Sequence, residues 1–414
     1  MNQNFVTEID IEHVRHLHNI VIPLSHKECR HLILTGKNGS GKTSVMDALA
    51  AFCSLYASSN NDYNAFISDQ KELLSLQEHI QTLAPNSPEY LQVSERMNLV
   101  QEYIHHYDQG AKAIFRDAEK VRVEAFQGKY IFAYYRAERE YQAKNETEIA
   151  KVELKDAYQM NEHPGQKFVQ YMLSLKSTGA MAEVGGKKTR AEEIKAWFKR
   201  FDEVLKLIFD DQSAHLDFDI ETFAFHIVID GREPFTFDTL SSGYAAVLDI
   251  VVDLMMRMEK KAGRHYDLEG LVLIDEIETH LHLALQRKIL PILTKLFPNI
   301  QFIITTHSPF ILNSIENAVI YDLENSTLVN RSEGLSDVPY DGIVEGYFQA
   351  PVLSEQLQKK YEAYKKLAQK KELTDDDYEK IAELEYYLDE IPDYLGLGFM
   401  ADYKRLKLEL AQRG

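Results

Sequence analysis

Apolar runs and segments with helical spacing alternate along much of the chain. Leu32-Ile33-Leu34 is an apolar run, and Val45 to Leu49 has the spacing of an amphipathic helix. Gly270 to Ile274 and Gln301 to Thr306 resemble the continuous apolar strands of a buried parallel sheet. Strands that alternate with helices in this way predict an α/β fold.

The alternation stops between residues 51 and 120. Residues 70–83 and 89–115 have helical patterns, and Ala84 to Pro88 between them has the Pro, Asn and Ser residues of a turn. We therefore expect an antiparallel helical hairpin. Two interpretations stay open: a short, coiled-coil-like insertion, or a plain helical subdomain packed on the sheet.

The rest of the chain is predicted to be mostly helical outside the strands. Residues 140–211 read as helical with a glycine-containing loop at 185–188, and two strand-like runs follow, at 215–220 and 223–230. Beyond residue 325 the sequence is polar, and it predicts helices over 355–371, 375–390 and 402–412. The predicted division is therefore a first lobe, 1–50, a helical insertion, 51–120, the remainder of the head, 121–325, and a helical C-terminal region, 326–414.

A complete phosphate-loop motif separates the first apolar run from the first helix. Its G-x-x-x-x-G-K-[ST] pattern is filled by Gly36, Lys37, Asn38, Gly39, Ser40, Gly41, Lys42 and Thr43, and Ser44 follows. Glycines let the backbone curl until its N–H groups point at phosphate oxygens, and the helix start adds partial positive charge. Lys42 is expected to reach the outer phosphates and Thr43 to bind Mg²⁺. A glycine-rich turn that binds nothing is the alternative, and the flanking strand and helix argue against it.

Two acids follow the apolar run that ends at Ile274. Asp275 stands where a strand-end carboxylate binds the Mg²⁺ that bridges nucleotide phosphates, and Glu276 can orient or deprotonate the attacking water. Many strands end in a solvated acidic turn, so the pair alone would be weak evidence. Together with the phosphate loop it predicts a Walker B strand and ATP hydrolysis.

A third motif, Leu240-Ser241-Ser242-Gly243-Tyr244, precedes a long apolar-periodic stretch. Serine and glycine there are typical of a helix N-terminus, and Ser241 or Ser242 could be an ordinary N-cap. The motif lies about thirty residues before Asp275. A nucleotide does not need two phosphate-binding helix starts from one chain, so this spacing predicts a dimer in which a second copy supplies one of them.

These motifs resemble those of the ABC-type ATPases, whose signature reads Leu-Ser-Gly-Gly-Gln or Leu-Ser-Ser-Gly-Glu; Tyr244 departs from it. Asp275 to His282 reads D-E-x-E-x-H-L-H, which is similar to the soluble branch of RecF-like, SMC-like and overcoming-lysogenization-defect (AAA_21-like) ATPases. Leu283 stands where that branch usually has Pro. His307, after the run ending at Thr306, resembles the branch's switch histidine. The resemblance covers roughly residues 1–50 and 120–325, and implies an ABC-type head with a mixed sheet flanked by helices.

The resemblance also implies roles at matching positions. It places the loop amides and Lys42 on ATP phosphates, Thr43 and Asp275 on Mg²⁺, Glu276 as catalytic base and His307 as γ-phosphate switch. Ser241, Ser242 and Gly243 would act across the dimer. His307 taken alone reads better as a core or capping histidine. His280 and His282 invite a metal interpretation, but their match to the family loop favours a structural or dimer-contact role. No Q-loop glutamine is evident. For Arg136 three environments stay open: a phosphate, a partner carboxylate, or a solvated turn.

Charge and cysteine content narrow the setting. The net charge is −19, from 46 basic and 65 acidic side chains among 414 residues, which argues against a surface that binds nucleic acid throughout. Only a local basic patch is compatible with it, and no nucleic-acid partner is evident. Cys29 and Cys53 are too few for a disulfide framework, and no signal peptide or membrane-spanning run is present. These features predict a cytoplasmic protein that does not enter a membrane.

No second active site is recognisable, neither a zinc–histidine nuclease motif nor a TOPRIM nuclease pattern. The motif set and helical C-terminus resemble the ATPases of bacterial anti-phage systems of the Septu, retron-associated and PARIS types. This resemblance implies a homodimer or higher homo-oligomer whose ATPase regulates or scaffolds a separate effector, a nuclease. Two alternatives stay open: a RecF- or SMC-like DNA-repair ATPase with DNA-stimulated hydrolysis, and a nucleotide-sensing module that does not hydrolyse.

Overall fold

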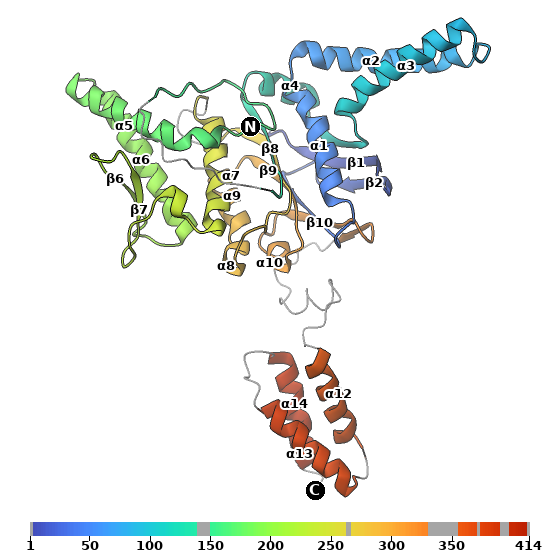
Figure 1. Ribbon diagram of the computed structural model, residues 1–414, viewed down its shortest axis with the longest axis vertical. Coiled ribbons are helices and arrows are strands. Elements are labelled where there is room, and N and C mark those ends of the chain that lie inside the picture. The colour runs from blue at the N-terminus through green and yellow to red at the C-terminus, as the bar shows by residue number, and fades with distance from the viewer. Residues whose placement is uncertain are drawn as a thin grey trace. The chain divides into compact units, whose positions relative to one another are not determined.

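The computed structural model describes residues 3–138, 150–261, 266–329, 355–370, 373–389 and 397–411. The chain divides into two compact units, Met1–Ser336 and Asp337–Gly414. Figure 1 shows the helices and strands of each unit. The predicted four-part functional division remains a prediction.

A six-stranded sheet forms the centre of the first unit, in the order β11-β10-β3-β9-β8-β5. Neighbours from β10 to β5 are parallel, and β11 is antiparallel to β10. The predicted mixed sheet flanked by helices is therefore confirmed. The strands are β3 (His31–Thr35), β5 (Tyr130–Tyr135), β8 (Glu269–Ile274), β9 (Ile300–Thr305), β10 (Ala318–Asp322) and β11 (Thr327–Val329).

A second, antiparallel sheet is joined to the first by helix α1 (Lys42–Tyr56). It consists of β1 (Val6–Val14), β2 (Leu17–Pro23) and β4 (Ala111–Phe115), in the order β2-β1-β4. Val45, Met46, Leu49 and Cys53 recur at helical spacing on α1 and are fully buried. Both sheets and α1 thus share one hydrophobic core.

The expected helix over 89–115 is wrong at its end. Helix α3 (Pro88–Tyr107) stops, and residues 111–115 form β4, which pairs with β1. Gly110 makes the turn between them with φ 89°, where a Cβ would stand 2.0 Å from the carbonyl oxygen of His13. The pairing partner lies about a hundred residues upstream, so local helical spacing did not reveal it.

Helices α2 (Asn60–Ile80) and α3 form the predicted hairpin. Ser59 and Ser87 cap their N-termini through side-chain hydrogen bonds, and a bidentate Arg96–Glu72 pair joins them. Figure 1 shows the hairpin running outward from the end of α1, away from the central sheet. This placement favours an insertion that projects from the head over a subdomain packed on the sheet.

The other side of the head is helical with a small hairpin of strands. Helices α5 (Phe168–Val184) and α6 (Lys188–Phe209) pack through Phe168, Trp197 and Phe201. The two strands expected after them are confirmed as β6 (His215–Phe218) and β7 (Phe225–Val228). The remaining helices in the described residues of this unit are α4 (Ala118–Phe126), η1 (Pro164–Lys167), η2 (Phe237–Thr239), α7 (Ser242–Met258), α8 (Leu283–Gln286), α9 (Ile289–Leu296) and α10 (Pro309–Leu312).

The second unit is helical, as predicted. It contains α12 (Glu355–Ala368), α13 (Asp375–Asp389) and α14 (Leu397–Ala411), the last of which begins earlier than expected. Tyr364, Leu388 and Tyr403 are fully buried in its own core. Across both units, no helix in the described ranges has the length and apolar character needed to cross a membrane.

Candidate functional site

The strand order brings three predicted motifs to one edge of the central sheet. β3, β9 and β8 are parallel neighbours, so their carboxyl ends open at the same edge. The phosphate loop follows β3, His307 follows β9 and the Asp275-Glu276 pair follows β8. Ligand sites in α/β sheets form outside the carboxyl ends of such strands.

The phosphate loop depends on glycines that take positive φ angles. Gly36, Gly39 and Gly41 have φ of 132°, 85° and 96°, a region that side chains avoid. A Cβ on Gly36 would come within 2.9 Å of Ser40 Oγ, so the loop also requires glycine for its tight curl. After Gly41 the chain enters α1, whose free N-terminal N–H groups face the loop.

Lys42 is the first residue of α1 and is only 5% exposed. Its Nζ donates to the carbonyl oxygens of Gly36, at 2.9 Å, and Lys37, at 3.1 Å. Burial lowers the pKa of its ammonium, while Glu276, Asp275 and Glu278 act in the opposite direction. The lysine thus closes the loop on itself and lies within the field of the Walker B carboxylates.

The remaining loop residues divide by exposure. Lys37, Asn38 and Gly39 are exposed, as is Thr43, whereas Ser40 is buried. Ser40 Oγ has no hydrogen-bond partner in the part of the chain that the structure describes. A buried hydroxyl of this kind in a curled loop fits a phosphate-binding role, because an anion would supply the missing acceptor.

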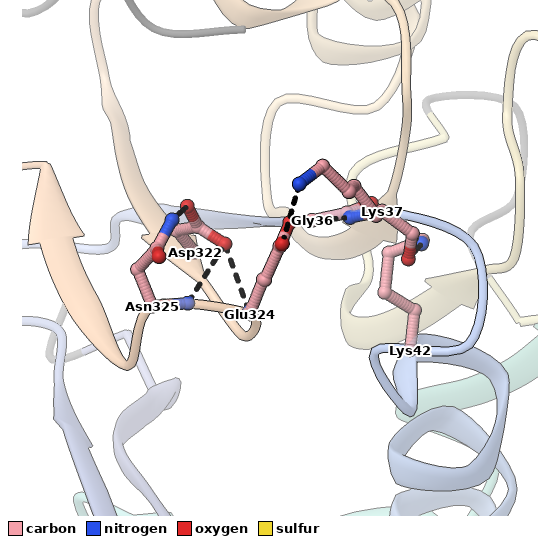
Figure 2. Close-up of polar contacts among 6 residues, drawn as sticks. All are labelled: Gly36, Lys37, Lys42, Asp322, Glu324 and Asn325. Atoms are coloured by element: carbon pink, nitrogen blue, oxygen red, sulfur yellow. Dashed lines mark hydrogen bonds and ion pairs between the residues drawn. The ribbon is translucent and has the colours of Figure 1, made fainter. Parts of the chain in front are cut away.

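The turn between β10 and β11 lies against the phosphate loop (Figure 2). Glu324 accepts a hydrogen bond from the Lys37 backbone N–H at 3.3 Å and pairs with Lys37 Nζ at 2.8 Å. Asp322 shapes the turn by accepting hydrogen bonds from the Glu324 N–H and from Asn325. A carboxylate therefore stands at the start of the loop, where sequence reasoning placed none.

The Walker B pair is held by Thr305 at the end of β9. Thr305 Oγ1 donates to Asp275 Oδ1 at 2.5 Å and accepts from the Glu276 N–H at 2.7 Å. Asp275 is 1% exposed, and Glu276 takes a left-handed φ of 44°. Because a non-glycine residue in that region is strained, the turn after β8 is fixed by its surroundings.

His307 lies opposite Glu278, the third acid of D-E-x-E. The His307 backbone N–H donates to Glu278 Oε1, and Ser308 Oγ donates to Gln286 Oε1 at 2.6 Å. Burial, followed by the Lys42 charge, lowers the pKa of His307, and the nearby carboxylates act in the opposite direction. The imidazole therefore belongs to the same electrostatic environment as Lys42, Asp275 and Glu276.

The signature residues lie elsewhere on the head. Ser241 is the N-cap of α7 by position but makes no side-chain capping bond, and both Ser241 and Ser242 are exposed. Gly243 is buried, and a Cβ there would stand 3.1 Å from the carbonyl oxygen of His280. A cavity of about 360 Å³ is lined by Ser241 to Tyr244 together with His280, His282 and Lys288, and by no phosphate-loop residue.

A buried ion pair ties the signature helix to the central sheet. On α7, Arg257 Nε donates to Asp253 Oδ2 at 2.8 Å, and both side chains are 2% exposed. Tyr135 at the end of β5 donates to the same carboxylate at 2.7 Å, and Arg257 Nη1 donates to the Phe132 carbonyl at 3.0 Å. Because every partner is hydrogen-bonded, removing one would leave a buried charge, at a cost of about 3–5 kcal/mol.

Arg136, at the end of β5, pairs with a carboxylate of its own chain. Its Nη2 lies 3.1 Å from Asp47 Oδ1, which also accepts a hydrogen bond from Tyr134. The pair borders an open cleft of about 1080 Å³ between α1 and the 159–166 segment. Residues 139–149, which include much of the stretch where a Q-loop would be sought, lie outside the described residues.

Sequence reasoning missed three residues at this edge: Thr305, Glu278 and Glu324. Glu278 had a signal, since D-E-x-E places a third acid two residues after Glu276. Thr305 and Glu324 had none, because their contacts arise from strand pairing between distant segments.

His280 and His282 belong to the signature cavity, and in the described ranges no group of three or more His, Cys, Asp or Glu side chains could hold a metal ion.

The residues at the sheet edge fit ATP and Mg²⁺. Four buried atoms there lack hydrogen-bond partners among the described residues: Thr35 Oγ1, Ser40 Oγ, Glu278 Oε2 and His307 Nε2. Native proteins rarely leave buried polar atoms unsatisfied, so this concentration indicates groups that a ligand completes. Carboxylate and hydroxyl oxygens, which Asp275 and Thr43 offer, are the ligands that Mg²⁺ prefers.

The chain is similar to curated ATPases over short segments. It is 35% identical over 113 residues to "Retron Ec83 probable ATPase" from Escherichia coli, covering 27% of this chain and 21% of that protein. It is 45% identical over 89 residues to "Septu protein PtuA" from Bacillus mycoides (strain KBAB4), covering 21% of this chain and 12% of that one. The matched segments thus span about a fifth of the retron protein and about an eighth of the Septu protein.

Among solved structures, the SMC head domain from Thermotoga maritima aligns over 77% of this chain and 94% of its own, with a TM-score of 0.36 and 11% identity. A likeness this loose carries no functional argument.

The comparison with protein families is stronger. The model described as "AAA domain, putative AbiEii toxin, Type IV TA system" matches residues 32–313, more than half of the chain, and the chain belongs to this family.

Proposed function

We propose that this protein binds and hydrolyses ATP, dimerises around the nucleotide, and regulates a separate effector, a nuclease, in bacterial anti-phage defence. The observation that carries the first part is the single sheet edge shared by the phosphate loop, Asp275-Glu276 and His307. The names of the retron and Septu relatives support the defence setting. Their short matches leave the effector as a proposal.

The residues divide the work of hydrolysis. Loop amides and Lys42 bind the phosphates, which requires Lys42 to exchange its two carbonyl acceptors for phosphate oxygens. Thr43 and Asp275 would hold Mg²⁺, which would neutralise phosphate charge when bound. Glu276 takes the proton of the attacking water, and His307 contacts the terminal phosphate. Thr305 orients both Walker B acids through its hydroxyl.

The dimer is proposed from the separation of the two phosphate-binding helix starts. Ser241, Ser242 and Gly243 line a cavity that contains no phosphate-loop residue, and the N-terminus of α7 is exposed. A second copy would bring this N-terminus onto the nucleotide held by the first, where its partial positive charge stabilises phosphate. Hydrolysis then requires two copies, whereas binding requires one.

The test is the native mass of complexes purified after co-expression with neighbouring genes, with and without ATP. Glu276→Gln keeps the size of the side chain but removes the base, so we expect it to accumulate an ATP-dependent dimer with hydrolysis reduced about 100-fold or more. The double variant Glu276→Gln/Lys42→Ala is the matched control and should stay monomeric.

A second polypeptide in the complex, carrying a nuclease motif, supports the effector proposal. A bare dimer whose hydrolysis rises on adding DNA contradicts it and favours a DNA-repair ATPase. If Glu276→Gln hydrolyses ATP at the wild-type rate, the base assignment is wrong. If ATP binds without any turnover by the wild type, the protein is a nucleotide sensor.

A further inference from the structure

The turn after β8 carries a third acid, Glu278, that reaches across to the neighbouring strand end. Two backbone hydrogen bonds close the turn: Thr279 N–H to the Glu276 carbonyl at 2.9 Å, and Leu281 N–H to the Glu278 carbonyl at 2.8 Å. Glu278 Oε1 accepts the His307 backbone N–H after β9. One carboxylate therefore links the Walker B turn to the switch segment.

The contact is of a strong kind. A carboxylate that accepts from a backbone N–H forms a charge-assisted hydrogen bond, about twice as strong as a neutral one. His307 is held on its other side by β9, whose pairing with β3 continues through the Thr306 N–H to the Leu34 carbonyl at 3.0 Å. The backbone at His307 is thus fixed between the phosphate-loop strand and Glu278.

Two polar atoms of this pair remain unsatisfied. Glu278 Oε2 and His307 Nε2 are both buried, and neither has a hydrogen-bond partner within the described ranges. Leaving a buried donor or acceptor without a partner destabilises the folded protein, because the group has lost its hydrogen bonds to water. Glu278 and His307 are joined by a hydrogen bond, and each has one such atom. This arrangement indicates that the pair is arranged for a ligand rather than for stability alone.

The charged side chains around Glu278 and His307 indicate where such a ligand would bind. Lys42, on α1, acts on His307 together with Glu278, Glu276 and Asp275 from the turn after β8. Glu278 also acts on Lys42, the phosphate-loop lysine. The unsatisfied imidazole nitrogen therefore shares its surroundings with the group expected to bind the outer phosphates of ATP.

We propose that Glu278 is the positioning residue for His307: its hydrogen bond to the His307 N–H sets the imidazole for contact with the terminal phosphate. This inference depends on the proposed function, because it assigns a role within that reaction. Glu278 acts through His307 and does not take the proton of the attacking water, which Glu276 does. Its hydrogen-bond acceptor, rather than its charge, is what the reaction requires.

The test compares Glu278→Ala, Glu278→Gln, His307→Ala and the double variant Glu278→Ala/His307→Ala. Displacing a reacting group by about 1 Å costs on the order of 100-fold in rate, so we expect Glu278→Ala to lower kcat about 10- to 100-fold with little change in ATP affinity. Glu278→Gln retains an oxygen acceptor and should stay within about threefold of wild type. Because Glu278 acts through His307, the double variant should match His307→Ala alone.

Glu28→Ala, which removes a surface carboxylate paired with Arg30, is the matched control and should leave turnover unchanged. Multiplicative losses in the double variant, or a Glu278→Gln as slow as Glu278→Ala, would overturn the positioning role. If Glu278→Ala does not fold, Glu278→Gln still decides, because low kcat in that folded variant would show that the charge is required.

A binding measurement separates this inference from the proposed hydrolysis. His307 contacts only the terminal phosphate, so its loss should reduce the preference for ATP over ADP, and Glu278→Ala should reduce it equally. Wild-type protein that binds ATP without turnover would refute hydrolysis, and the ATP-to-ADP affinity ratio would still test Glu278. An unchanged ratio in Glu278→Ala alongside a reduced one in His307→Ala would refute the positioning role.

Discussion

The phosphate-loop edge and the start of the signature helix are two phosphate-binding candidates built in opposite ways. At the sheet edge, Lys42 and Asp275 are buried, and their surroundings include four buried atoms without partners in the described residues. At the start of α7, Ser241 and Ser242 are exposed and Ser241 makes no capping bond. One region has buried binding groups, and the other has exposed serines beside a cavity of about 360 Å³.

Under the proposed dimer, this difference assigns the buried groups to catalysis within one subunit and the exposed helix start to contact between subunits. Buried groups can bind a ligand only if their own chain arranges them, and strand pairing does this at the sheet edge. An exposed helix start presents its N–H groups to whatever approaches, and an anion held by another copy is suited to it. Variants in the two regions should therefore fail in different ways.

The largest effect is expected for Lys42→Ala. It removes the buried ammonium that closes the phosphate loop, so ATP affinity should fall about 100-fold or more, equivalent to about 3 kcal/mol or more. Isothermal titration calorimetry measures the ATP affinity directly. Lys195→Ala, which breaks a surface pair with Glu183, is the control and should bind ATP normally. Tight binding by Lys42→Ala would remove the phosphate loop from the site.

Ser241→Ala should separate binding from turnover. A single subunit should bind ATP normally, while hydrolysis falls about 10-fold or more because a transition-state contact from the second copy is lost. Since Ser241 makes no capping bond, thermal stability should change little. Ser87→Ala is the converse control: it removes a real cap from α3, costs about 1 kcal/mol, and should leave turnover intact. Normal turnover in Ser241→Ala would contradict the composite site.

The smallest effect is expected for Glu324→Gln. The Lys37 hydrogen bond lowers the pKa of Glu324, so the carboxylate is charged at neutral pH and repels phosphates beside the loop. Removing this exposed charge should tighten ATP binding, by less than about fivefold, and the gain should shrink in high salt. Weaker binding at low salt would mean that Glu324 supports the loop more than it repels nucleotide. Glu28→Gln serves as the charge-matched control.

Local motifs predicted the parts of the site, and long-range pairing supplied the rest. The phosphate loop, the acids after β8 and the histidine after β9 are each contiguous, and their strands were predictable from apolar runs. Their chemical roles remain predictions. Thr305 forms hydrogen bonds with Asp275 and Glu276, which follow β8. The helical pattern over 89–115 extends into β4, whose partner is the distant strand β1. Such contacts have no local signature.

The neighbours of β3 have a consequence for how the protein is made. Leu32 pairs with Ile303 on one side and Val319 on the other, so the strand that begins the phosphate loop finds both partners only among residues made far later. Pairing over such separations is slow, and it leaves strand edges uncovered while the chain grows. During synthesis, the capacity to bind nucleotide is therefore acquired late, and a ribosome-bound chain that stops before β9 cannot display it.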